Sequence, residues 1–405
     1  MKALRPLVLL VLLGAAALGL FGCSEDKSVD EAATADQLFA QGIAYLEASM
    51  SGVNPEEPPW MWDIDTERAN GFFEDALDID PDHCGALVMA AVTRLAMVLQ
   101  DPELGDIIED LFPEEGRGPG GPGDFLFRTL TKPDVYTAAR RLRESSRIDF
   151  PFSELQNFIE AEVLPALEYA DGNLAQFEGQ DCVVLLEIEV EGERQVVEIE
   201  IDATDALLLH APLDVLQAVF YIAVSYNVDV EEGQTLQELI DEDPDFLSLR
   251  PGDHMASAYA ELWEMHWHLS ESAWELANET DPQDTDLFTN TDDEGWIPLG
   301  AGYADTLSWI AEEVYDALQN GLSFNPAEDT PDPEAPDIPL LVDLEEFFTD
   351  PLDPITDYFP AHTWSDPESI VVTMPIDFPD PTFSDITPGM TDEYWGEFFS
   401  WLTAE

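Results

Sequence analysis

The chain has 405 residues, of which 87 are acidic and 14 are basic, so its formal net charge at pH 7 is −73. A surface this negative repels phosphate groups and anionic lipid headgroups, which excludes charge-driven binding to nucleic acid. Hydrophobic residues make up 45% of the chain, so it can bury a core and is not a disordered acidic tail. The acidic residues are spread along the whole sequence. This favours solubility or adaptation to high salt over divalent-cation binding as the reason for the charge.

The N-terminus has the layout of a secretory signal peptide, in which cations precede an apolar run and a small residue. Residues 1–22 read MKALRPLVLLVLLGAAALGLFG, and Cys23 follows. The end of this segment resembles the lipobox of bacterial lipoproteins at Leu20, Gly22 and Cys23, although Phe21 is bulkier than the usual residue. The resemblance implies that Cys23 is lipidated and becomes an acylated N-terminus. The alternatives are ordinary cleavage that leaves a thiol, or an uncut membrane anchor.

A lipidated Cys23 would attach the protein to a membrane of the bacterial cell envelope through its acyl chains. Residues 23–34 are polar and predict a flexible tether. Ser24 is not an aspartate, and in lipoproteins that resemble enterobacterial ones this favours the outer membrane, on its periplasmic or surface face. The later apolar segment Ala203–Tyr226 contains several polar residues, so we expect a buried helix there and not a membrane span.

The next part of the chain, residues 35–323, predicts a mainly α-helical domain. Apolar residues at helical spacing predict helices over Asp36–Met50 and Thr66–Ile79. The second of these carries residues at the spacing of a tetratricopeptide repeat: Ala69, Phe73, Ala76 and Pro81. Gly42 and Tyr45 match the glycine and tyrosine of that repeat's first helix. The sequence therefore resembles one tetratricopeptide unit, interrupted by a proline- and tryptophan-rich insert.

This resemblance implies a packing pattern and a type of function. Small residues let the two helices of the repeat approach closely, and large residues fill the groove between them. A helix predicted over Gly85–Leu99 would begin a second unit. Arrays of such hairpins provide concave surfaces for peptide or protein contacts. The alternative is a helical hairpin that has this spacing by coincidence.

Further helices are predicted over Asp134–Arg147, Phe152–Asp171, Gly252–Asn278 and Tyr303–Asn320. The first of them carries a cluster of arginines: Arg140, Arg141, Arg143 and Arg147. These side chains either neutralise neighbouring carboxylates, which we favour, or form a docking site for an anionic group.

Strict alternation of apolar and acidic residues predicts one β-hairpin over residues 183–202, with a turn near Gly192. A lone hairpin is only marginally stable, so we expect its apolar face to lie on the following helix, Thr204–Tyr226. Pro212 should kink or split that helix. Leu213–Val224 is apolar almost all round, which predicts a central helix of the core.

Residues 324–405 are rich in proline and aspartate and predict an extended region that packs on the helical body. Exceptions are the periodic run Leu340–Phe348 and a short terminal helix over Thr391–Leu402. Its scattered aromatic residues are the expected anchors: Tyr358, Phe359, Trp364, Phe378 and Phe383.

Two cysteines remain besides Cys23, namely Cys84 and Cys182. An exported location permits a disulfide between them. The alternative is two separate buried thiols. Neither residue belongs to a CxxC motif, so we expect no zinc or redox site through them.

Metal and catalytic signatures are weak in this sequence. Asn290, Asp292 and Glu294 resemble the first half of an EF-hand loop and form a weak calcium candidate, but Ala301 stands where the bidentate glutamate belongs. His266 and His268 lie two apart on a predicted helix, where side chains point to different faces, so the histidines are interpreted as surface or satisfied residues. No HExxH, GxSxG or dinucleotide fingerprint occurs. The sequence therefore predicts no cofactor and no enzyme.

Together these features predict a lipid-anchored binding or scaffold protein of the cell envelope with a protein or peptide partner. The first alternative is a transporter-associated or nutrient-capturing lipoprotein, similar to the helical lipoprotein of TRAP transporters, which a deep apolar pocket would favour. The second alternative is an envelope hydrolase, which would require a buried carboxylate pair or a metal in a cleft.

Overall fold

The fold is known from a computed structural model. It describes residues 34–50, 64–104, 152–177, 182–190, 193–228, 245–278, 288–289, 297–300, 302–325, 337, 340–355, 361–366, 369–373 and 386–388. Within these ranges the protein is mainly helical, as predicted, and its strands form only two-stranded sheets. The principal helices are α2 (Ala35–Met50), α3 (Thr66–Ile79), α4 (Cys84–Leu99), α9 (Leu164–Phe177), α10 (Ala203–Ser225), α12 (His254–Asn278) and α13 (Tyr303–Asn320).

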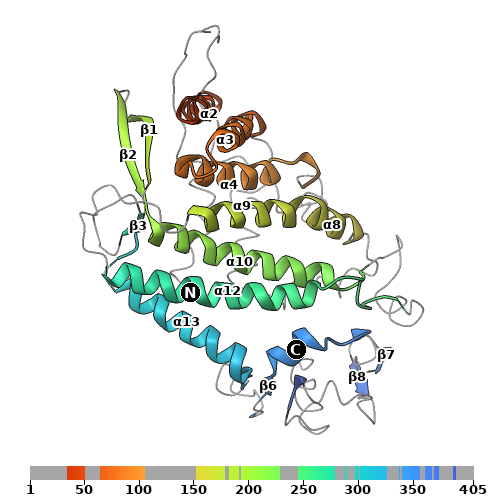
Figure 1. The fold of residues 1–405 in the computed structure, drawn as a ribbon. Helices are drawn as coiled ribbons and strands as arrows, with labels where there is room; N and C mark the ends of the chain where they lie inside the picture. The colour runs from red at the N-terminus through yellow and green to blue at the C-terminus, as the bar shows by residue number, and fades with distance from the viewer. Residues whose placement is uncertain are drawn as a thin grey trace.

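The principal helices are stacked in chain order (Figure 1). Each packs mainly on the helix before it and the helix after it, from α2 and α3 through α4, α9, α10 and α12 to α13. This nearest-neighbour packing is typical of helical repeat arrays. The main hydrophobic core lies between α2, α3, α4, α9 and the start of α10, and smaller clusters lie along α10, α12 and α13.

The first hairpin of the array packs through the small residues that the sequence singled out. A Cβ atom placed on Gly42 of α2 would lie 2.5 Å from the ring of Phe73 in α3, so the glycine is what allows the ring to sit there. Phe73 and its neighbours Ala69 and Ala76 are completely buried. Across the insert, the Tyr45 hydroxyl donates a hydrogen bond of 2.9 Å to Asp65, which links the two helices at their other end.

We therefore expect Gly42→Ala to destabilise the protein, by about 1–3 kcal/mol, because the new methyl group overpacks the Phe73 contact. Gly71→Ala is the matched control, since it lies on α3 where a Cβ would meet nothing within 4 Å. Alanine there should be neutral or stabilising by up to about 1 kcal/mol, because it favours the helix. Urea unfolding of both variants measures the difference, and equal effects would contradict close packing at Gly42.

The helix predicted to begin at Phe152 is longer than expected and contains a π-helical turn. It runs as α8 (Phe152–Phe158), a π turn (Ile159–Val163) and α9, which ends at Phe177. The turn ends two residues before Pro165, whose missing N–H removes one helical hydrogen bond. A π turn contains one more residue than an α turn. The amphipathic pattern of the sequence gave no indication of this insertion.

Helix α10 is the central helix of the fold, as predicted, and lies between α9 and α12 (Figure 1). Asp202 and Asp205 form a reciprocal capping box at its start. By length and composition α10 also resembles a membrane span, but it carries several buried polar residues against its neighbours. Of the kink or split predicted at Pro212, the split does not occur, because the helix is continuous from Ala203 to Ser225. Packing on both sides outweighs the one hydrogen bond that proline removes.

The predicted β-hairpin is present, with β1 (Cys182–Val190) antiparallel to β2 (Glu193–Ile201). Its register pairs apolar positions with each other, as Val184 with Ile199 and Leu186 with Val197. The hairpin contacts α10 as expected, and also α4. Cys84, the first residue of α4, is disulfide-bonded. Cys182 is the first residue of β1, the strand that contacts α4.

The C-terminal region is more regular than predicted. Its described elements are β5 (Leu322–Phe324), β6 (Leu340–Val342), α15 (Leu344–Thr349), β7 (Ala361–Asp366) and β8 (Ser369–Thr373). A short parallel pair precedes α13, formed by β3 (Phe288–Thr289) and β4 (Ile297–Pro298). The region is anchored by Phe348, whose ring stacks on Tyr259 of α12 at 5.5 Å. Of the predicted anchors, Trp364 lies in β7, and Tyr358, Phe359, Phe378 and Phe383 lie outside the described residues.

Candidate functional sites

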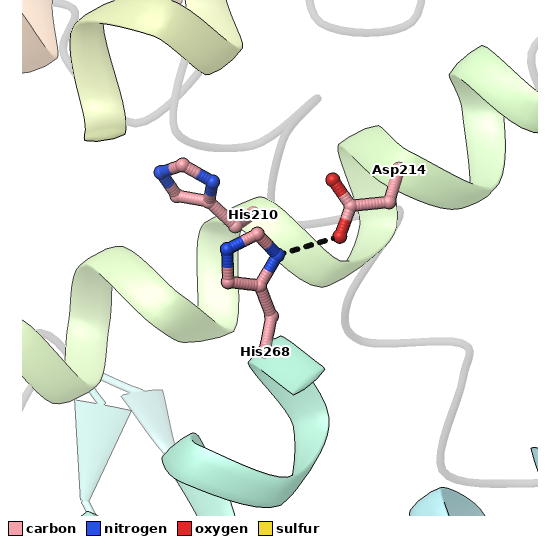
Figure 2. Close-up of side chains that lie close together, drawn as sticks. All are labelled: His210, Asp214 and His268. Carbon is pink, nitrogen blue, oxygen red and sulfur yellow. Dashed lines mark hydrogen bonds and ion pairs between the residues drawn. The ribbon is translucent and has the colours of Figure 1, made fainter. Parts of the chain in front are cut away.

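Three buried side chains meet between α10 and α12: His210, Asp214 and His268 (Figure 2). His210 and Asp214 are one helical turn apart on α10, so both project from the same face of that helix. His268 comes from the facing side of α12 and forms a hydrogen bond of 2.7 Å between its Nδ1 and Asp214 Oδ2. The rings of the two histidines lie 4.4 Å apart, centre to centre.

This cluster is enclosed, and several of its polar atoms lack partners. His210 and Asp214 are each 1% exposed and His268 is 5% exposed. Neither ring nitrogen of His210 has a well-aligned hydrogen bond, and Asp214 Oδ1 and the amide nitrogen of Gln217 have none. An unpaired buried polar group costs about 1–3 kcal/mol. Several unpaired polar atoms in one buried cluster indicate that a group other than protein, such as an ion or water, interacts with them.

Carboxylates surround the cluster and perturb its protonation. Burial, followed by repulsion from Asp171, raises the pKa of Asp214 to about 8. Burial and the charge of Asp214 raise the pKa of Glu261, on α12, to about 7. Burial lowers the pKa of His210, but the nearby carboxylates, Asp171 above all, outweigh burial and leave that pKa raised. The site therefore favours bound positive charge.

The three side chains of the cluster are suited to bind a metal ion or to hold protons. One ligand atom from each of His210, Asp214 and His268 lies within 4.8 Å of the others. Two imidazoles and one carboxylate form a donor set that binds divalent transition metals. At the same time, Asp214 is too deeply buried to meet a substrate directly.

A second candidate site is formed by exposed aromatic side chains of the α12–α13 pair. Their exposed fractions are 43% for Trp267, 60% for Trp274, 59% for Trp309 and 44% for Tyr315. Tyr315 also contacts the rings of Trp263 and His266, which joins the two helices. Exposed tryptophan and tyrosine side chains are enriched at interaction sites, so each of the four residues is a candidate for contact with a partner.

Comparison with known protein families, curated proteins and solved structures gave no significant match. The residues and their geometry are therefore the only basis for a proposed function.

Most of the site residues predicted from the sequence lie outside the described residues. These are the lipidation residue Cys23, the arginines Arg140, Arg141, Arg143 and Arg147, and the calcium candidates Asn290, Asp292 and Glu294. Their predictions remain predictions. Cys84 and Cys182 lie at the first residues of α4 and β1.

The buried cluster was missed at the sequence level, and the interpretation of the histidines as ordinary was wrong for His210. His268 is satisfied in part, through Asp214. The available signal was polar residues at positions 210, 214 and 217, which share one face of an otherwise apolar segment. Their partner on α12 could not be identified, because pairing of α10 with α12 is a property of the tertiary fold.

Proposed function

We propose that the protein is a lipid-anchored binding or scaffold protein of the bacterial cell envelope, and that its helical array docks a protein or peptide partner. The nearest-neighbour stacking of α2 to α13 supports this proposal, because such arrays leave long surfaces open for contact. The observation that carries it is the exposure of Trp267, Trp274, Trp309 and Tyr315 on α12 and α13. Tryptophan and tyrosine are the residues most enriched among binding hot spots.

The charge of the chain indicates the chemistry of the partner. Exposed carboxylates accompany the aromatic residues on the same two helices, at Glu264, Asp305, Glu312, Glu313 and Asp316. Lysine and arginine side chains pair with carboxylates and also stack on indole rings through cation–π contacts. We therefore propose a partner segment that contains lysine or arginine.

The alternative of an envelope hydrolase would require a buried carboxylate pair or a metal in a cleft. Asp214 is buried, and its charge helps to raise the pKa of Glu261, which is only partly buried. However, Asp214 is 1% exposed, so a substrate cannot reach it without a large opening of the helices. Binding is therefore the better-supported proposal.

The partner test is a crosslinking pull-down from envelopes with the lipidated protein, followed by affinity measurement with the purified candidate. Trp274→Ser and Trp309→Ser together should weaken binding about tenfold or more, because they remove two exposed anchors. Ile79→Ser is the matched control, since Ile79 is equally exposed (54%) but lies at the end of α3. Affinity should also fall as salt rises. A partner that binds both tryptophan variants as tightly as the wild type would contradict the proposed surface.

The membrane proposal has a separate test in detergent-phase partitioning. Wild-type protein expressed in a bacterium should enter the detergent phase, because its acyl chains are the proposed anchor. Cys23→Ala should move the protein to the aqueous phase, and Ser24→Ala, which leaves Cys23 and the disulfide-bonded Cys84 in place, serves as the control. Wild-type protein found in the aqueous phase would overturn lipid attachment.

A further inference from the structure

We propose that His210, Asp214 and His268 form a binding site for a divalent transition-metal ion, for which zinc is the probe. This site lies inside the helical array and is adjacent to the proposed docking surface, because the Trp267 ring lies 4.9 Å from the His268 ring, centre to centre. It would join α10 to α12 through the ion, and would also hold α9 through Asp171.

The unpartnered atoms of the cluster are the first argument. The His210 side chain is only 1% exposed, and neither of its ring nitrogens has a well-aligned hydrogen bond. Asp214 Oδ1 is unpartnered as well, while its Oδ2 is bonded to His268. A nitrogen and an oxygen that both lack partners, within one enclosed cluster, are the ligands that an ion would use.

The surroundings of His210 match those of a metal ligand. Asp171 Oδ1 lies 3.2 Å from His210 Nδ1, an ion-pair distance. Histidines that bind metals commonly donate one N–H to a carboxylate, which fixes the ring and leaves the other nitrogen for the ion. Asp171 therefore occupies the place of such an orienting carboxylate, and His210 Nε2 is the nitrogen left to bind the metal.

The charge around the cluster is the second, independent argument. The carboxylate of Asp171 lies 3.2 Å from His210 Nδ1, so His210 is close to a second acidic side chain besides Asp214. Burying negative charge without a counter-charge is costly. Arg250, a basic side chain near the end of α10, pairs with Glu160 at 2.8 Å and also bonds the carbonyl of Val224. A dication would supply the missing positive charge.

The geometry requires a small adjustment on binding. Ligand atoms that share a zinc ion at about 2.0–2.2 Å stand roughly 3.3 Å apart, whereas the atoms of the cluster span up to 4.8 Å. The side chains would have to converge by at most about 1.5 Å, which rotation about their χ angles can supply. Imidazole nitrogens favour zinc, iron, nickel or copper over calcium and magnesium.

The competing explanation is that the cluster holds protons and no metal, with a protonated His210 between Asp171 and Asp214. The experiment is calorimetric titration of zinc into EDTA-stripped, re-dialysed protein, in buffer with excess magnesium and salt so that surface carboxylates are occupied. We expect one zinc per chain, a rise in melting temperature, and tetrahedral-type absorption bands when cobalt replaces zinc.

Substitutions of the cluster residues test whether zinc binds at this site and not elsewhere on the protein. His210→Ala and His268→Ala should lose more than about a hundredfold in zinc affinity, and Asp171→Asn should lose about 10–100-fold as an orienting residue. His266→Ala is the control, because His266 lies on the same helix but bonds the carbonyl of Ala311 outside the cluster. Circular dichroism establishes that each variant is folded.

Asp214→Asn keeps the experiment decisive if a histidine variant fails to fold, because it nearly preserves the shape of the side chain. Zinc uptake should be lost in this variant while the fold remains. Absence of zinc binding by the wild type, or binding that none of the cluster variants changes, would overturn the metal site. Either outcome would leave the docking proposal on α12 and α13 untouched.

Discussion

Asp214→Asn is expected to stabilise the metal-free protein, even though it replaces a residue in the centre of the core. The carboxylate of Asp214 is buried and repelled by Asp171, which raises its pKa to about 8. Asparagine has nearly the same shape and retains an oxygen that can accept a hydrogen bond from His268, but it carries no charge to bury. The gain should be on the order of a few kcal/mol at alkaline pH.

The gain should depend on pH in a defined direction. An acid whose pKa is higher in the folded than in the unfolded state binds more protons when folded, so its contribution to stability falls as pH rises between the two pKa values. For Asp214 this window runs from about pH 4 to about pH 8. The difference in stability between variant and wild type should therefore grow across that window and level off above it.

Urea unfolding in EDTA at a series of pH values measures this difference. Asp343→Asn is a useful comparison, since Asp343 caps α15 and accepts a hydrogen bond from the Glu346 N–H. Asparagine caps a helix about as well as aspartate, so this substitution should change stability little at any pH. If Asp214→Asn destabilises the metal-free protein at every pH, the description of Asp214 as an uncompensated buried acid is wrong.

Phe73→Ala should lower the free energy of unfolding by about 3–5 kcal/mol, because it removes a completely buried ring from the main core and leaves a cavity. The ring fills the space next to Gly42 and lies 5.7 Å from the ring of Phe39, centre to centre. Few single changes in the array should cost as much. Thermal and urea unfolding of the variant provide the measurement.

Phe72→Ala is the matched control for this prediction. Phe72 is the preceding residue of α3 and is only partly buried, with its ring 6.2 Å from that of Tyr45. The same substitution should cost clearly less there, since water already reaches part of the ring. Equal losses at positions 72 and 73 would contradict the orientation of α3 in the array.

The helices were predictable from the sequence because their signals are local. Apolar spacing located α3 and α13 at their observed ends, and Gly42 and Phe73 of the first hairpin were identified as its packing residues. The two strands of the β-hairpin were equally evident from alternation. Such patterns depend on neighbouring residues alone.

The remaining features depend on contacts between distant segments. Pro212 predicted a break that the packing of α9 and α12 on α10 overrides. Phe348 anchors the C-terminal region on Tyr259, which lies far from it in the sequence. The cluster of His210, Asp214 and His268 requires the register of α10 against α12. No periodicity within either helix specifies that register.

Crystallography of zinc-soaked protein, with anomalous data collected at the zinc absorption edge, tests the buried site most directly. The expected result is one strong peak about 2.0–2.2 Å from ligand atoms of His210, Asp214 and His268, with Asp171 bonded to the far nitrogen of His210. Peaks confined to surface carboxylates, with only water or closed side chains between α10 and α12, would contradict the proposed metal site.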